Sequence, residues 1–135
     1  MGCDIHAHAE IKINGRWEHY DQPEFDRDYA LFEKMAGVRG NIANAIASPR
    51  GLPDDATSST RFDSDNWDSD GHSHSWLSSK EIHELAEWEE KRGAGTFKRK
   101  WDRWLFGNNY SDFIKYPDSR AKGLEDVRFV FWFDN

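Results

Sequence analysis

Residues 3–13 alternate between apolar and polar side chains with a period of two, which is the pattern of a β-strand with one buried face. Every odd position in residues 3–13 is apolar. Asn14 and Gly15 tolerate the positive φ angles of a tight two-residue turn, and residues 16–21 return as a second strand. The pattern therefore predicts a β-hairpin.

A two-residue turn also determines which side chains face each other across the hairpin. The predicted pairs are Lys12 with Trp17, Glu10 with His19, and His8 with Asp21. We expect these side chains on a polar face outside the core, with the apolar residues of the first strand on the other face.

Three later stretches have the features of helices. Residues 26–37 carry an apolar stripe between a possible N-cap, Asp26, and a helix-ending glycine, Gly37. A Ser-X-X-Glu capping box opens residues 78–92, which continue as an amphipathic helix. A further helical segment is predicted at residues 97–105.

The rest of the chain predicts one long connection and one strand. Residues 40–71 contain Pro49, Pro53 and many Ser, Asp and Asn residues, so we expect an irregular segment. Residues 127–133 are β-branched and aromatic and too apolar for an exposed edge, so we expect a central strand. The prediction is an α+β fold, in which the N-terminal hairpin and the C-terminal strand form a small antiparallel sheet whose apolar face is covered by about three helices.

Composition supports a single folded domain over residues 1–135. Hydrophobic residues make up 37% of the chain and charged residues 32%, which alone is typical of a loosely folded protein. Seven Trp, nine Phe and four Tyr reverse that interpretation, because each aromatic side chain buries a large area.

Charge and cysteine content exclude several classes. The net charge of −7 opposes general binding to DNA or RNA. The sequence has no apolar run of the ~20 residues that cross a membrane and no signal-peptide pattern, so we expect a cytoplasmic protein. The single cysteine, Cys3, excludes an intramolecular disulfide and a cysteine-based zinc finger.

Two histidine motifs are the candidate chemistry. On a strand, residues i and i+2 project from one face about 6–7 Å apart, so two imidazoles can bind one metal ion. The predicted ligands of one or two divalent ions, most simply Zn or Mn, are Asp4, His6, His8, His72 and His74. Glu10 or Asp70 is the predicted general base. The competing interpretation is that the first motif is an ordinary solvent-facing strand and the second an exposed loop.

Several sequence blocks resemble an uncharacterised family of small bacteriophage and bacterial proteins. These blocks are residues 1–6, 26–32, 36–39, 51–55, 70–77 and 130–135. The resemblance implies no established activity, but a phage setting is compatible with nucleotide metabolism or with disarming a host nucleotide signal by cleavage or sequestration. The Asp-X-His-X-His string is also similar to the first motif of metal-dependent amidohydrolases and phosphoesterases, over five residues only.

Two functions from different classes follow. The first is a metal-dependent hydrolase that acts on a phosphoester or nucleotide. The alternative is a non-catalytic, phage-type binding protein that sequesters a small nucleotide, with a homo-oligomer as its possible form. Product formation distinguishes them.

Overall fold

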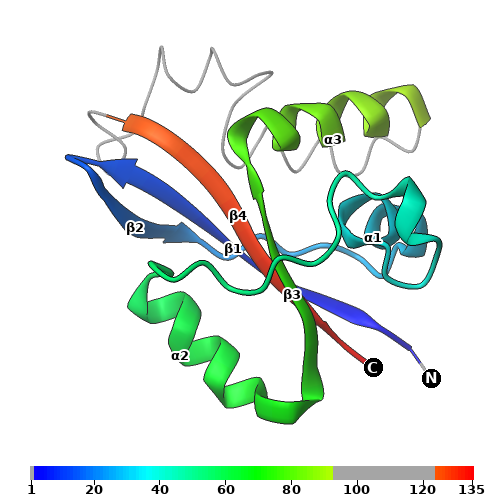
Figure 1. The fold of residues 1–135 in the computed structure, drawn as a ribbon, viewed down its shortest axis with the longest axis horizontal. Coiled ribbons are helices and arrows are strands. Elements are labelled where there is room, and N and C mark those ends of the chain that lie inside the picture. Colours follow the sequence, from blue (N-terminus) through cyan, green and yellow to red (C-terminus); the bar gives the residue numbers. More distant parts are fainter. Residues whose placement is uncertain (1, 93–123) are drawn as a thin grey trace.

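A four-stranded antiparallel sheet in the order β2-β1-β4-β3 forms the centre of the molecule (Figure 1). This computed structural model describes residues 2–92 and 124–135. The strands are β1 (Asp4–Ile13), β2 (Arg16–Asp21), β3 (Gly71–Ser78) and β4 (Leu124–Asp134). The helices are α1 (Tyr29–Ala36), α2 (Ser58–Trp67) and α3 (Ser79–Arg92), with short 3-10 helices η1 (Ile42–Asn44) and η2 (Asp68–Asp70). The predicted α+β fold is confirmed, with β3 as an additional strand.

The N-terminal hairpin forms as predicted, with one change of register. Asn14 and Gly15 have φ angles of 52° and 76°, as the tight turn requires. Lys12 faces Trp17 and Glu10 faces His19. Beyond these pairs a β-bulge shifts the register, so that Ala9 and not His8 lies opposite Asp21. The predicted pairing of His8 with Asp21 is therefore wrong.

Helix α1 is shorter than predicted at its start. Its N-cap is Asp28, whose carboxylate accepts a hydrogen bond from the Leu31 amide, so the predicted cap at Asp26 is wrong. Its end at Gly37 is confirmed, because this residue takes the left-handed conformation with a φ of 77°.

The capping box of α3 is also confirmed. The Ser78 amide donates to Glu81 Oε1 at 3.0 Å, and the Glu81 amide donates to Ser78 Oγ at 3.3 Å. The helix predicted at residues 97–105 lies outside the described residues.

The prediction of an irregular segment over residues 40–71 is wrong, because α2 lies within it. Thr57 caps this helix by accepting a hydrogen bond from the Thr60 amide. The helix has no apolar stripe, since its residues that bury most completely are the small polar Thr60 and Ser64. Hydrophobic periodicity gave no signal of it for this reason.

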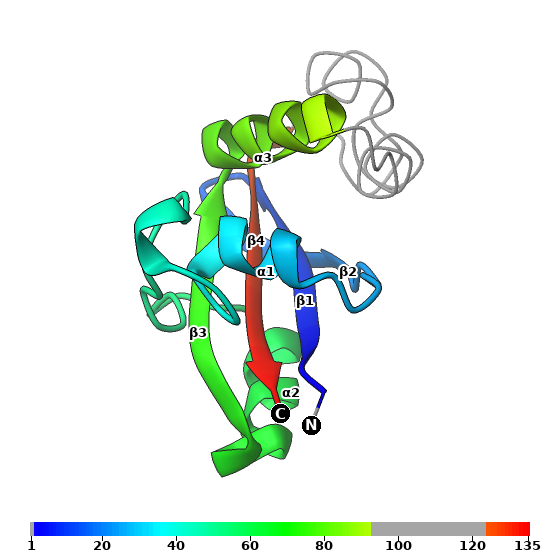
Figure 2. The ribbon, with the colours of Figure 1, turned by 90° about the vertical axis from the view of Figure 1, so that its right-hand side faces the viewer.

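The helices cover both faces of the sheet (Figure 2). α1 and α3 pack on the face that carries the apolar residues of β1, and together they enclose the hydrophobic core. α2 lies on the opposite, polar face. The predicted central position of the C-terminal strand is confirmed, and residues 127–133 of β4 are buried because both faces are covered. None of the helices in residues 2–92 and 124–135 has the length and apolar character of a membrane span.

Candidate functional site

Helix α2 covers the polar face of the sheet over strands β1 and β4. Cross-strand register brings His6 opposite Trp132 and Glu10 opposite Arg128. Side chains of such pairs project from the same face. His8 lies between them on β1 and is only 1% exposed, and Glu10 is fully buried. The expectation that both side chains lie outside the core is therefore wrong, because α2 covers them.

His8 forms hydrogen bonds through both ring nitrogens. Its Nε2 lies 2.8 Å from Oδ2 of Asp63 on α2, and its Nδ1 lies 2.9 Å from Nε2 of His19 on β2. Three elements thus place one residue each in a connected chain, which we call the His8 triad (Asp63, His8 and His19). The sequence placed His8 and His19 on one face, but Asp63 lies in the segment predicted to be irregular.

The protonation of the triad follows from its contacts. Aspartate is ionised at neutral pH and only accepts, so His8 donates its Nε2 proton to Asp63. In the tautomer in which Nδ1 of His8 carries no proton, this atom accepts the Nε2 proton of His19. This leaves the Nδ1 of His19 as an unprotonated, basic nitrogen. Among the described residues no hydrogen bond engages that atom.

The surroundings of His19 favour its neutral form. Burial lowers the pKa of His19 below its usual value, and the neighbouring His8 lowers it further. The carboxylates of Asp21 and Asp63 act in the opposite direction and do not reverse the shift. The side chain is half-buried. The lowered pKa of His19 favours the neutral imidazole, the form in which Nδ1 can accept a proton.

Three of the histidines pack around the indole ring of Trp132. Its ring centroid lies 6.1 Å from that of His6, 5.3 Å from that of His8 and 5.6 Å from that of His74. Trp132 is fully buried, and its Nε1 has no hydrogen-bond partner among the described residues. The indole thus lies among the imidazoles that the two motifs contribute.

Glu10 is held entirely by structural contacts. Its Oε2 accepts from the Thr57 amide at 2.9 Å and the Thr60 hydroxyl at 2.8 Å, and its Oε1 accepts from Arg128 Nε at 2.8 Å. Burial alone would raise the pKa of Glu10, but these hydrogen bonds outweigh it and hold the pKa below its usual value. With every oxygen engaged and no exposure, Glu10 ties the start of α2 to the sheet.

The other predicted site residues point in separate directions. Asp4 forms a two-point ion pair with Arg27, and His6 Nε2 lies 2.6 Å from Asp134. Asp70 is exposed at the end of η2.

The second histidine motif lies on β3, and a β-bulge divides it. His72 lies opposite Phe133 and contacts Asn135, whereas His74 packs on Trp132, so the two imidazoles do not converge. Burial lowers the pKa of His74, with a smaller contribution from His72.

The metal site predicted from both motifs is not assembled in this arrangement. Within residues 2–92 and 124–135, no three His, Cys, Asp or Glu side chains are grouped so that they could hold a metal ion. Two histidine nitrogens, His8 Nδ1 and His19 Nε2, lie 2.9 Å apart and point at each other. A histidine that binds a metal through one ring nitrogen usually donates a hydrogen bond from the other to a carboxylate or carbonyl. The hydrogen bond between His8 Nε2 and Asp63 has this form.

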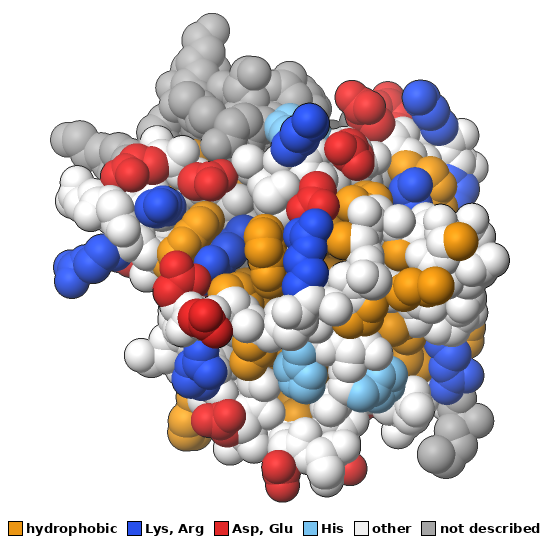
Figure 3. Space-filling model, in the orientation of Figure 1, with side chains coloured by type: hydrophobic (Ala, Val, Ile, Leu, Met, Phe, Trp, Pro, Cys, Tyr) orange, Lys and Arg blue, Asp and Glu red, His pale blue; other side chains and the backbone are white. Residues whose placement is uncertain are grey.

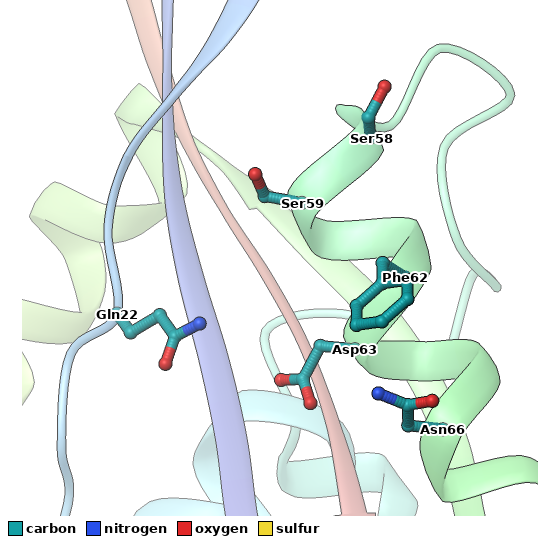
Figure 4. Close-up of a pocket in the computed structure, with 6 residues that line it drawn as sticks. All are labelled: Gln22, Ser58, Ser59, Phe62, Asp63 and Asn66. Atoms are coloured by element: carbon teal, nitrogen blue, oxygen red, sulfur yellow. The ribbon is translucent and has the colours of Figure 1, made fainter.

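An open pocket of about 580 Å³ lies along α2, with Asp63 of the triad in its lining (Figure 4). We call it the α2 pocket; its lining residues are Gln22, Ser58, Ser59, Phe62, Asp63 and Asn66. Asp63 belongs to both the pocket and the triad, and it is 32% exposed. The pocket therefore gives a bound molecule access to the carboxylate end of the triad.

The surrounding surface carries charges of both signs. On the face shown in Figure 3, acidic and basic side chains are interspersed, and histidine side chains reach the surface. Among the described residues on this face, the basic side chains do not form a continuous surface for a nucleic-acid backbone.

Sequence reasoning missed three residues of the site, Asp63, Arg128 and Trp132. Alternation along residues 124–134 places Arg128 and Trp132 on one face, and this signal was available. The register of β4 against β1 could not be predicted from the sequence, because no tight turn connects the two strands.

Comparisons with known proteins leave the site to be judged on its geometry. No protein-family model, curated protein or solved structure gives a significant match to this chain.

Proposed function

We propose that the protein is a hydrolase that acts on a phosphoester, such as a nucleotide, with the His8 triad as its acid–base centre. The observation that carries the proposal is the pair of hydrogen bonds that joins Asp63 to His8 and His8 to His19. A carboxylate that orients one imidazole, which in turn orients a second, is suited to moving a proton.

The triad's role is that of a general base. Nδ1 of His19 accepts a proton from water as the water oxygen attacks phosphorus, and the proton then passes to the leaving oxygen. The positive charge that forms on His19 is stabilised by the carboxylates of Asp63 and Asp21, which favour its protonated form. His8 holds the ring of His19 in one orientation throughout.

A divalent ion, Zn or Mn, remains part of this proposal. Nδ1 of His8 and Nε2 of His19 are the two nitrogens that would hold it, with Asp63 orienting His8. Two protein ligands require water or substrate to complete the coordination shell. When bound, such an ion stabilises negative charge on a phosphoryl oxygen. The proton transfer at Nδ1 of His19 belongs to the ion-free form, because a neutral imidazole that binds an ion through Nε2 carries its proton on Nδ1.

The second candidate is a binding protein that sequesters a nucleotide without cleaving it. The α2 pocket favours this candidate, because it is an open hollow in which a molecule can be held by side chains alone. In this case the triad is a structural link between β1, β2 and α2. We further propose a cytoplasmic location in the phage setting that the sequence resemblance implies, with homo-oligomer formation still a prediction.

Hydrolysis of p-nitrophenyl phosphate, bis(p-nitrophenyl) phosphate and a panel of nucleotides tests the proposal. We expect His19→Ala to lower the rate by about 10²–10⁴-fold, the usual contribution of a general base. Since the pKa of His19 is lowered, the acid limb of the pH–rate profile should lie below pH ~6.5. His83→Ala is the matched control, because His83 lies on α3, away from the triad.

The same assay separates the alternatives. Loss of activity with EDTA and recovery with Zn or Mn, absent in His19→Ala, would support the ion-binding role. An unchanged rate in His19→Ala would overturn the triad as the acid–base centre. Stoichiometric nucleotide binding with no product from any substrate would instead establish sequestration.

A further inference from the structure

Phe62 on α2 is the most exposed large hydrophobic residue among those that the structure describes. It is 70% exposed, compared with 51% for Ile42 and 37% for Tyr29. Its ring stabilises no core contact and lies in the wall of the α2 pocket (Figure 4). A single exposed phenylalanine is ordinary on a surface, but one in the wall of a pocket that also contains Asp63 of the His8 triad is suited to contact a ligand.

The helix places polar groups on either side of this ring. Ser58, Phe62 and Asn66 are spaced by four residues and so share one face of α2. Ser59 and Asp63 form the neighbouring row, and Gln22 lies across from them on the segment that follows β2. The Phe62 ring is thus bordered by the amides of Gln22 and Asn66 and by the carboxylate of Asp63.

These groups select a class of ligand. An aromatic side chain can stack on the flat face of any of the nucleobases, whichever base is present. The amides of Asn66 and Gln22 each offer a donor and an acceptor, which match the mixed edge of a base. Asp63 uses Oδ2 toward His8 and keeps Oδ1 to accept from an amino group.

Size and charge narrow the class further. A volume of about 580 Å³ falls within the usual range of small-molecule sites, roughly 300–1,000 Å³. No Lys or Arg is among the residues that line the pocket, so the pocket has no cationic side chain for a phosphate group. The pocket therefore suits the ring of a nucleotide, with the phosphate outside it.

We propose that the α2 pocket binds a nucleobase, or a similar heteroaromatic ring with an amino group, stacked on Phe62 between Gln22, Asn66 and Asp63. As a statement about the substrate, this inference rests on the proposed hydrolase. As a statement about binding, it stands on the pocket alone. It assigns ring recognition to α2 and the reaction to the neighbouring His19.

Nucleosides are the appropriate probe, because they lack the phosphate on which hydrolysis depends. Adenosine, cytidine and guanosine should shift the amide NMR signals of α2 residues in a saturable titration, and uridine should bind more weakly because it lacks an amino group. Phe62→Leu should raise the dissociation constant about tenfold or more, while Phe62→Tyr should keep it near the wild-type value. Phe62 is exposed, so both variants are expected to fold, which thermal melting checks.

Ile42→Ala is the control for removing an exposed hydrophobic residue outside the pocket, and it should leave nucleoside binding unchanged. Nucleoside binding that Phe62→Leu weakens, without hydrolysis of any nucleotide, supports the pocket and overturns the proposed hydrolase. Hydrolysis with no nucleoside binding, and with no effect of Phe62→Leu, supports the hydrolase and overturns the pocket.

Discussion

For Glu10, the sequence predicts a general base, whereas its contacts in the structure tie the start of α2 to the sheet. A carboxylate beside two histidines on a strand is a reasonable general base, and only its partners distinguish the roles. Arg128, which faces it across the sheet, is itself almost fully buried and also binds Asp55 at 2.9 Å. Removing one member of such a buried pair leaves the other charge uncompensated.

We therefore predict that Glu10→Ala lowers the free energy of unfolding by about 3–5 kcal/mol. Asp70→Ala, which removes an exposed carboxylate, should change it by less than about 0.5 kcal/mol. Urea unfolding monitored by tryptophan fluorescence measures both. Unchanged stability in Glu10→Ala together with lost turnover would restore the general-base role that the sequence suggested.

At this scale, the sequence could predict which residues share a face but not which atoms meet. The pairing of Glu10 with His19 follows from a local turn and is confirmed. The contact of His8 with Asp63 joins residues 55 positions apart and depends on where α2 docks. Long-range contacts of this kind leave no trace in local periodicity.

The elements differ in how strongly local sequence specifies them. The hairpin and α3 carry their own turn and cap residues, so they could be predicted with their ends. α2 contacts the sheet through hydroxyl and carboxylate groups rather than an apolar stripe, and so it was missed. The local signal for the start of α2 was the N-cap residue Thr57.

The end of α1 offers a prediction at the scale of one element. A Cβ added at Gly37 would lie 2.7 Å from the Cα of Ile42, in addition to requiring a positive φ. We expect Gly37→Ala to lower the free energy of unfolding by about 3 kcal/mol or more, from the left-handed backbone and the overlap together.

Gly15→Ala provides the matched comparison. Gly15 has nearly the same φ, 76°, but nothing lies within 4 Å of an added Cβ. Its cost should be about 1–2 kcal/mol, from backbone strain alone. Equal melting temperatures for the two variants would show that the segment with Ile42 moves away from the added Cβ at position 37 without a cost in stability.

In the whole molecule, the sheet separates two kinds of interior. One face packs apolar side chains against α1 and α3, and the other holds ion pairs and imidazoles beneath α2. Burial of polar groups costs free energy unless each is hydrogen-bonded, so the α2 face depends on protonation in a way that the apolar core does not. The part of the pH dependence of stability that comes from His19 and His74 should therefore report on the α2 face.

Stability should fall in two steps as the pH is lowered. The pKa values of His19 and His74 are lowered by burial, so the unfolded chain binds protons first, near pH 6.5, and stability declines from there to the folded-state pKa values. Each proton contributes a slope of at most about 1.4 kcal/mol per pH unit. The lowered pKa values of Glu10, Asp28 and Glu81 add a second step, because the stabilisation from these carboxylates is present above pH ~4.3 and is lost as the pH falls through their folded-state pKa values.

A double variant isolates the first step. His19→Gln with His74→Gln should remove the decline that begins near pH 6.5 and keep the one below pH ~4.3, whereas His83→Gln should retain both. Urea unfolding at intervals from pH 7.5 to pH 3 measures the profiles. A wild-type protein that becomes more stable between pH 7 and pH 5 would mean that His19 and His74 are stabilised in their charged forms, and that His19 is then already protonated where the proposed mechanism needs it to be a base.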